Sequence, residues 1–324
     1  MKCIVCGINE AYENGICIDC LANLKNVSYD KVNITECPKC GAIKINKRWY
    51  YNNPENELFN HVSRILKKKN KDIEEIYNYS MDNNINLTLK FSDGIEKTLN
   101  IPLEISKESC PVCNKLTGSY YEAIIQLRTF SRERSYLIDD ARNIIVDDVK
   151  RYNRQDPNSF ISKIANLKEG IDIYLGKKED AIKIIKDLDS KYFINTRVTK
   201  SLAGKKDGID IFRYTHLIRM FDLDPGSIIF GRGKNYMVKS VEPGNINIID
   251  LSIKKDVTMD EKTFFSSNFD VIRKPEKRRF IVISNNGLET ELMDEKNFNI
   301  ITVKGIISKD SIDLYNYNDE YYII

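Results

Sequence analysis

The sequence predicts an α+β protein of several domains, and three observations predict it. All eight cysteines lie in C-x-x-C pairs within the first 113 residues. Helical and alternating apolar patterns then follow one another up to residue 220. After residue 224, short alternating segments are separated by tight turns, which is typical of small β-barrels. We expect a cysteine-rich domain with an inserted helix and hairpin, a small α/β domain and two small β domains, with these bounds: 1–150 (insertion 41–109), 151–220, 221–273 and 278–324.

The composition indicates a soluble, intracellular protein. With 324 residues, 42% of them hydrophobic, the chain is long enough for several modest domains. Its net charge of +3 comes from 50 basic and 47 acidic residues, so any affinity for nucleic acid has to come from local clustering of cations. No apolar run approaches the roughly 20 residues that cross a bilayer, and the start MKCIVCGINE lacks a signal-peptide core. We therefore expect a cytoplasmic monomer with no membrane partner.

The cysteine pairs predict two closed zinc sites. In a C-x-x-C pair, a tight turn presents both sulfurs to one metal ion, and two such turns complete a tetrahedral shell of thiolates. Ten residues separate the first two pairs, and 69 separate the last two. The favoured pairing is sequential, first with second and third with fourth, while a crossed pairing stays open. The expected ligands of two structural Zn²⁺ ions are Cys3, Cys6, Cys17, Cys20, Cys37, Cys40, Cys110 and Cys113.

Other uses of these cysteines are less favoured. C-x-x-C is a poor spacing for a structural disulfide, and a chain without a secretory signal is expected to stay reduced. A redox pair would be expected once, beside a thioredoxin-like pattern that this sequence lacks. Four complete pairs leave no open coordination position, so we expect structural ions in a treble-clef or ribbon-like region.

Between the third and fourth pairs the pattern predicts a helix and a hairpin. Pro54 opens a helix with apolar residues at helical spacing, and the lysines at 67–69 close it. Cations in a last turn complement the helix dipole, which we favour slightly over a role in gripping phosphates. Residues 85–91 and 97–103 alternate around the turn S-D-G, a hairpin signal.

The fourth pair runs directly into GSYYEAIIQLR, which alternates like a strand. Ala123, Ile125 and Leu127 share one face, which we expect to pack against the zinc core, while the other face presents Gln126 and Arg128. Amide and guanidinium groups on a rigid strand suit contacts to sugar-phosphate and base edges. Ordinary solvated strand residues would give the same pattern, and the pattern alone does not separate the two interpretations.

The rest of the chain predicts a helix, an α/β segment and short strands. Residues 134–153 form an amphipathic pattern whose carboxylates we interpret as a solvated face rather than a catalytic pair. A helix is expected at 178–189, among strands at 170–175, 192–200 and 208–214. Further strands at 227–231, 235–241 and 245–251 predict a small barrel, and an alternating section from 280 to 324 predicts another small β unit.

No catalytic constellation emerges from the sequence. The G-R-G-K run at 231–234 lacks the spacing and the strand-to-helix setting of a phosphate-binding P-loop. His61 and His216 stand alone and are interpreted as packing or surface residues. We therefore expect a protein that is not an enzyme.

Several motifs together point to one family. The four C-x-x-C pairs, Trp49 after the third pair and GSYYEAIIQLR after the fourth resemble the Nmd-three family, the ribosomal large-subunit nuclear export adaptors of eukaryotes and their archaeal homologues. The resemblance covers most of the chain and implies an SH3-like barrel from DPGSIIF onward and an OB-like end. Eukaryotic members continue into a tail with transport signals. The sequence ends at Ile324 without one, so the resemblance favours an archaeal homologue over an export adaptor.

This resemblance implies a factor that binds the joining face of the large ribosomal subunit across the tRNA sites, in late assembly or quality control. The implied partners are ribosomal RNA, ribosomal proteins and other assembly or anti-association factors. The barrel pair also resembles the hypusine-bearing translation factor, but the residues around Lys234 do not match, so no modified lysine carries over. The residues expected to contact RNA are Lys39, Lys47, Arg48, Tyr120, Gln126, Arg128, Arg132 and Arg134.

Two alternatives of other classes stay open. One is a zinc-containing RNA-processing or RNA-modifying enzyme, which would need a pocket with titratable groups. The other is a zinc-ribbon transcription component, which would bind a polymerase instead of a ribosomal subunit.

Overall fold

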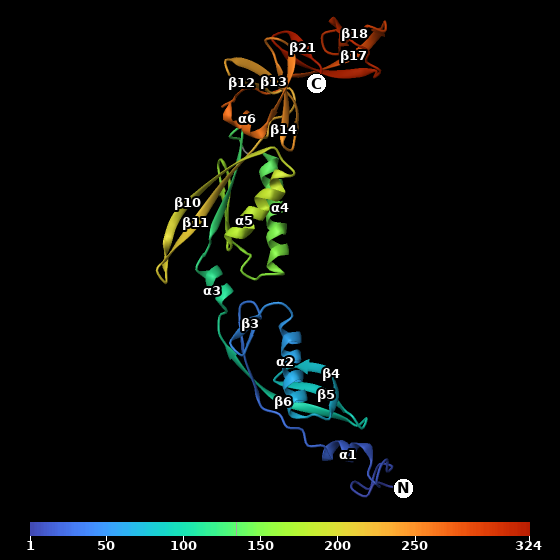
Figure 1. Ribbon diagram of the computed structural model, residues 1–324. Helices are drawn as coiled ribbons and strands as arrows, with labels where there is room; N and C mark the ends of the chain where they lie inside the picture. Colours follow the sequence, from blue (N-terminus) through green and yellow to red (C-terminus); the bar gives the residue numbers. More distant parts are fainter. Residues whose placement is uncertain (134) are drawn as a thin grey trace. The chain divides into compact units, whose positions relative to one another are not determined.

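The protein was analysed as a computed structural model, which describes residues 1–133 and 135–324 (Figure 1). These residues form two compact units, Met1–Gly118 and Ser119–Ile324. Both units combine helices with strands, so the expected α+β class is confirmed. None of the described helices is long and apolar enough to cross a bilayer.

The first unit is built around a six-stranded sheet with the order β3-β2-β1-β6-β5-β4. Helix α2 packs on it because Leu58, Val62 and Leu66, spaced four residues apart, enter one core with the hydrophobic residues of β5. Its elements are α1 (Ile18–Leu24), β1 (Val32–Glu36), β2 (Ile43–Ile45), β3 (Arg48–Tyr50), α2 (Pro54–Lys69), β4 (Ile73–Met81), β5 (Asn84–Phe91), β6 (Glu96–Lys107) and α3 (Pro111–Thr117).

The predicted helix and hairpin are present in this unit. α2 begins at Pro54 and has three lysines in its last turn, and β5 and β6 pair antiparallel as expected. The last five residues of β6 continue past the hairpin and run parallel to β1. β4 was not expected, because most of its residues are at least partly exposed and a register shift interrupts its alternation.

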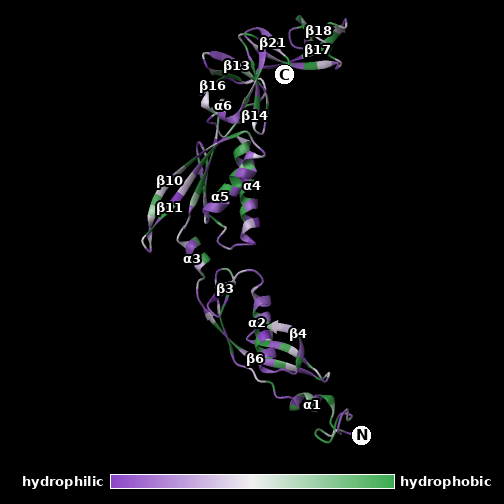
Figure 2. Ribbon diagram, in the orientation of Figure 1, coloured by the Kyte–Doolittle hydropathy of each residue, from purple (hydrophilic) through white to green (hydrophobic). Residues whose placement is uncertain are grey.

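The second unit begins with a five-stranded sheet of order β10-β11-β7-β9-β8. Helices α4 and α5 contact each other and share one core with alternate residues of β7, namely Ala123, Ile125 and Leu127. Figure 2 shows hydrophobic and hydrophilic residues alternating along β10 and β11. The elements are β7 (Ala123–Thr129), α4 (Tyr136–Asn153), β8 (Ile161–Leu167), β9 (Gly170–Leu175), α5 (Lys178–Asp189), β10 (Ile194–Lys206) and β11 (Ile209–Met220).

This arrangement differs from the division expected at residue 150. β7 and α4 lie in the core of the second unit, and the buried face of β7 packs against α4, α5 and its neighbouring strands, not against the cysteine region. The expectation that β7 packs on the zinc core is therefore wrong. Alternation shows which residues of a strand are buried, but it does not show which sheet the strand joins.

Two five-stranded antiparallel sheets complete the second unit, consistent with the two small β domains expected. Their orders are β15-β14-β13-β12-β16 and β19-β18-β17-β20-β21. The elements of the first are β12 (Ile228–Gly231), β13 (Lys234–Glu242), β14 (Asn245–Asp250), β15 (Lys255–Asp260), α6 (Glu261–Ser266) and β16 (Asp270–Arg273). Those of the second are β17 (Lys277–Asn285), β18 (Glu289–Asp294), β19 (Ile300–Lys304), β20 (Ser311–Tyr317) and β21 (Glu320–Tyr322).

An aromatic cluster joins the α/β sheet to the first of these β domains. Phe193 directly precedes β10 and Phe221 directly follows β11, and their ring centroids lie 5.7 and 5.4 Å from that of Phe264 in α6. Phe264 is fully buried and stacks on Phe269 at 4.8 Å. Because the rings come from both domains, apolar packing holds the two domains together.

We expect Phe264→Ala to lower the free energy of unfolding of the second unit by about 3–5 kcal/mol, because deleting a buried ring leaves a cavity between two domains. Urea unfolding followed by circular dichroism measures the change. Leu288→Ala is the control: this side chain in the same unit is 80% exposed, and its removal should cost less than about 0.5 kcal/mol. Equal stability of the two variants would contradict a stabilising role for the cluster.

Candidate metal centres and nucleic-acid interface

Parallel strand pairing assembles the second cysteine cluster. β1 and β6 pair as far as Glu36 and Lys107, whose side chains form a 2.6 Å ion pair at that edge. Cys37 directly follows β1 and Cys110 follows β6 by three residues. Since parallel strands end at the same edge of a sheet, their two C-x-x-C pairs meet although 69 residues separate them in the sequence. Cys110 is the N-cap of α3, and Cys113 lies in its first turn.

In the first cluster, as in the second, one C-x-x-C pair lies at the start of a helix. Cys17 is the N-cap of α1 and Cys20 lies in its first turn. Cys3 and Cys6 come from an N-terminal turn, in which the Gly7 N–H donates to the Cys3 carbonyl at 2.8 Å. In both clusters one pair comes from a turn and the other from the start of a helix, which is the treble-clef alternative rather than the ribbon.

The sulfur positions fit a tetrahedral metal ion. Within each cluster the four Sγ atoms lie within 4.8 Å of one another, and the distances Cys6 Sγ to Cys17 Sγ and Cys40 Sγ to Cys110 Sγ are both 3.7 Å. Zinc–sulfur bonds of about 2.3 Å place the sulfurs of a tetrahedron about 3.8 Å apart. The sequential pairing is therefore confirmed. The two groups are Cys3, Cys6, Cys17 and Cys20, and Cys37, Cys40, Cys110 and Cys113.

Within each cluster the thiols differ widely in pKa. Burial opposes the charge on Cys3, but backbone N–H donors led by that of Cys17 lower the pKa of Cys3 to about 6. Hydrogen bonding to Cys17, with burial, raises the pKa of Cys20 to about 12. In the second cluster backbone donors lower the pKa of Cys37 to about 6 against its burial, while burial raises the pKa of Cys113. A divalent cation that binds must therefore displace protons, among them that of Cys20.

Gln126 and Arg128 lie on the face of β7 opposite its buried residues, as the alternation predicts, but Asp172 of β9 holds both side chains. Gln126 Nε2 donates to one carboxylate oxygen at 3.0 Å, and an Arg128 guanidinium N–H donates to the other at 2.8 Å. The Arg128 side chain is only 16% exposed and also donates to the Leu127 carbonyl at 2.9 Å. These contacts give Arg128 a structural role, and its contact with RNA stays a prediction.

Asp172 is a site residue that sequence reasoning missed. Its side chain is 10% exposed in the strand GIDIYL, where every other residue except Tyr174 is buried. A lone carboxylate in an otherwise apolar strand signals a buried partner of opposite charge, because an unpaired buried charge is costly. The sequence alone does not reveal that β9 lies beside β7.

The RNA-contact candidates of the first unit lie near the second cluster and in a hairpin turn. Lys39 follows Cys37 by two residues, and its Nζ donates to Thr117 Oγ1 at 2.8 Å. Lys47 has a positive φ of 70° in the turn between β2 and β3. Arg48, the next residue, places its guanidinium 5.4 Å from the ring centroid of Tyr50. All three cations are exposed.

The candidates of the second unit flank β7. Tyr120 donates its hydroxyl to Glu122 at 2.8 Å, and burial with this carboxylate raises the pKa of Tyr120 to about 12. Arg132 is exposed in the turn after β7. Arg134 lies outside the described residues. The candidates are thus divided between the two units, and their contacts with RNA stay predictions.

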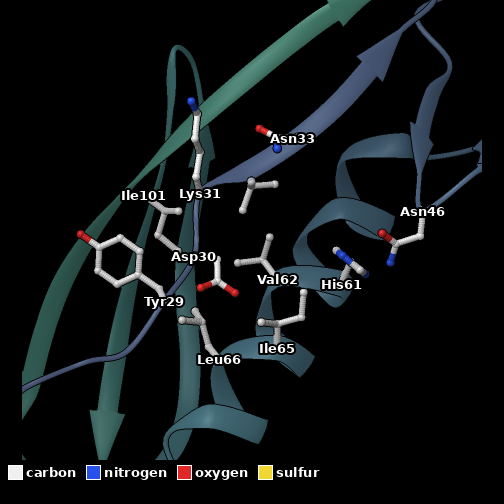
Figure 3. A pocket seen from close by; sticks show the side chains of 11 residues that line it. Tyr29, Asp30, Lys31, Asn33, Asn46, His61, Val62, Ile65, Leu66 and Ile101 are labelled. Atoms are coloured by element: carbon white, nitrogen blue, oxygen red, sulfur yellow. The ribbon is translucent and has the colours of Figure 1, made fainter.

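A cavity of about 230 Å³ lies beside α2 (Figure 3). Figure 3 shows Asp30 near aliphatic residues of α2, with His61 beside Asn46. Asp30 is paired with Lys69, while burial and the nearby Arg64 lower the pKa of His61 and favour its neutral form. The residues that line the cavity include no serine, threonine or cysteine.

His216 and the G-R-G-K run, both singled out in the sequence, have positions that the fold explains. His216 is 5% exposed, and burial lowers its pKa, as expected for a packing residue. The G-R-G-K run forms the turn between β12 and β13, and Lys234 Nζ donates to Asp250 at 2.8 Å.

Family models match most of the first unit and about half of the second. The family model described as NMD3, N-terminal domain, matches residues 3–118, and the one described as NMD3, second domain, matches residues 120–220. Together the matches cover more than half of the 324 residues. The chain belongs to the NMD3 family. The junction of the two NMD3 matches coincides with the boundary between the units at Gly118 and Ser119. Membership of the NMD3 family suggests a ribosome-related factor.

Individual proteins are less similar to this NMD3 chain. No curated protein matches it. Among solved structures, eukaryotic translation initiation factor 5A from Methanococcus jannaschii matches over 32% of this chain and 88% of its own, with 15% identity and a TM-score of 0.21. A TM-score this low supports no conclusion about shared function.

We expect the purified protein to contain two metal equivalents, and Cys17→Ser or Cys37→Ser to contain one each, because every sulfur of a cluster is needed for a closed shell. Elemental analysis of metal content measures this, and limited proteolysis locates the loosened segment. Ser109→Ala, which changes the neighbour of Cys110 without removing a sulfur, should keep both equivalents. Two equivalents in a cysteine variant would contradict the assigned ligand set.

We expect Arg128→Ala to lower the free energy of unfolding by about 3 kcal/mol, because the buried carboxylate of Asp172 loses its cation. Chemical denaturation measures the change, and Arg128→Ala/Asp172→Ala should recover part of it. Arg219→Ala is the matched control: Arg219 is the exposed neighbour of Arg128 on β11. If the two single variants were equally stable, the buried ion pair would have no stabilising role.

Proposed function

We propose that this NMD3-family protein binds the joining face of the large ribosomal subunit and acts in late assembly or quality control by occupying the tRNA sites. The observation that carries the proposal is the match of both NMD3 domain models, over residues 3–118 and 120–220. Its partners are ribosomal RNA, ribosomal proteins and other assembly or anti-association factors, encountered by a free monomer in the cytoplasm.

The chemistry of the clusters supports binding rather than turnover. Each holds four sulfurs at distances that suit one tetrahedral ion, so a bound Zn²⁺ would have no position left for a substrate or a reactive water. The ions are therefore proposed to be structural zinc, and the protein a non-enzymatic factor. A C-x-x-C turn whose sulfurs bind a metal ion is rigid. Such a turn lowers the entropic cost of placing a nearby cation, such as Lys39, against folded RNA.

We expect the protein to co-sediment with purified, salt-washed large ribosomal subunits in a sucrose gradient at moderate salt, and not with small subunits. Raising the salt should release it, because contacts to phosphates exchange with counterions. Metal content is followed in the same fractions, so that a loss of binding caused by loss of metal is recognised. Protein that holds both metal equivalents but sediments with neither subunit would contradict the proposal and direct attention to RNA turnover or polymerase binding.

A further inference from the structure

Strands β10 and β11 continue beyond their sheet as a two-stranded ribbon (Figure 1). The two strands pair along their whole length, but β11 pairs with β7 only from Tyr214 onward, so residues 200–213 have no third strand beside them. Two of the ribbon's apolar side chains, Leu202 and Ile209, are 58% and 72% exposed. A two-stranded ribbon with exposed apolar groups is only marginally stable in water, so a partner that covers this one would also stabilise it.

The ribbon and its base concentrate the positive charge of the chain. Residues 197–219 contain six basic and two acidic residues, a formal charge of +4, whereas the whole chain sums to +3. The remainder of the protein is therefore close to neutral. This segment is the local clustering of cations that binding to a polyanion requires when the net charge is small.

Three arginines of this segment share the sheet face that α4 and α5 leave uncovered. Arg213 and Arg219 alternate on β11 with the buried residues His216 and Ile218, which point toward the helices. Arg197 joins them because it pairs in register with Leu217, which lies on the same face of β11. We call Arg197, Arg213 and Arg219 the arginine face.

The arginine face lacks the carboxylates that neutralise cations elsewhere in the chain. Among the described residues, neither Arg197 nor Arg219 makes a hydrogen bond or ion pair, and both are exposed. Arg219 nevertheless lies in register with Arg128, and like charges on neighbouring strands repel. The guanidinium of Arg213 lies 4.2 Å from the ring centroid of Tyr121, an arrangement that fixes its position without neutralising its charge.

We propose that the arginine face binds the ribose-phosphate backbone of folded RNA. Arg213 and Arg219 are six residues apart on one strand, so their Cα atoms are separated by about 20 Å, which exceeds the reach of a single small anion and suits a polyanion. Arginine presents a planar set of donors that matches phosphate oxygens, and a strand keeps these donors at fixed intervals. The inference rests on the proposed function, because it assigns the RNA contact of a ribosome-binding factor to one surface.

The test compares two variants that remove the same charge from opposite sides of the sheet. Arg197→Gln/Arg219→Gln alters the arginine face, and Lys150→Gln/Lys186→Gln alters exposed residues of α4 and α5. Both variants are first checked for an unchanged Tm and metal content. Filter binding to purified large-subunit ribosomal RNA is then measured at several salt concentrations, and co-sedimentation with large subunits is measured in parallel.

We expect the arginine-face variant to bind the RNA about tenfold more weakly than the helix-side variant. In a plot of the logarithm of the binding constant against the logarithm of the salt concentration, its slope should be smaller in magnitude by about 1.5, as for two lost phosphate contacts. Equal RNA binding by the two variants would overturn the inference. A loss of subunit binding without a loss of RNA binding would also overturn it, since the face would then contact a ribosomal protein.

The two proposals can fail separately. If the unaltered protein co-sediments with large subunits and both variants bind RNA equally, the inference fails and the proposed function stands. If the unaltered protein does not bind subunits but the arginine-face variant alone loses RNA affinity, the inference stands and the proposed function fails. An unaltered protein that binds neither subunits nor RNA would overturn both.

Discussion

Repulsion among thiolates is the constraint on which both cysteine clusters of the first unit depend. Each cluster brings four sulfurs within 4.8 Å of one another, where like charges repel unless a cation binds, and in the first cluster hydrogen bonding to Cys17 and burial raise the pKa of Cys20 to about 12. The first cluster has almost no other core, since only Ile16 adds a hydrophobic side chain to its cysteines among the described residues. Burying one isoleucine contributes about 2 kcal/mol, whereas zinc binding to thiolate sites in small peptides contributes about 10 kcal/mol or more. A metal ion held by the first cluster would therefore supply most of the stability of the N-terminal segment.

The second cluster relates to the fold differently, because strand pairing and metal binding support each other there. The parallel register of β1 and β6 delivers Cys37 and Cys110 to one edge, and an ion bound at that edge would fix the start of α3. The core on α2 is hydrophobic and does not include the cysteines of this cluster. Loss of the metal should thus leave that core folded while releasing the strand ends. In the described part of the second unit, α4 and α5 pack on the sheet, and the aromatic cluster around Phe264 holds its junction with the first β domain.

What the sequence reveals about this protein is mostly local. Periodicity and turn chemistry suffice for α2, for α5 and for the hairpin of β5 and β6, because those signals lie within a few adjacent residues. The cysteine spacing likewise favours the correct sequential pairing. The sheet to which β7 belongs could not be predicted, since its partners β9 and β11 lie far along the chain. For the same reason the ion pair of Arg128 could not be predicted, because Asp172 becomes its neighbour only through strand pairing.

Contacts created by folding also make the net charge a poor guide to the ligands of this protein. Many of its cations are neutralised within the fold, as Lys107 is by Glu36 and Lys234 by Asp250, and such pairs present little field to a ligand. Among the described residues, Arg197 and Arg219 of the arginine face have no carboxylate partner, so their charges are not neutralised within the fold. A nearly neutral protein is expected to have weak non-specific attraction to RNA at large, since that attraction scales with the phosphates neutralised. In the proposed complex, affinity depends on whether an RNA backbone matches the arginine face, so the geometry of the sheet, rather than the composition of the chain, would set the selectivity.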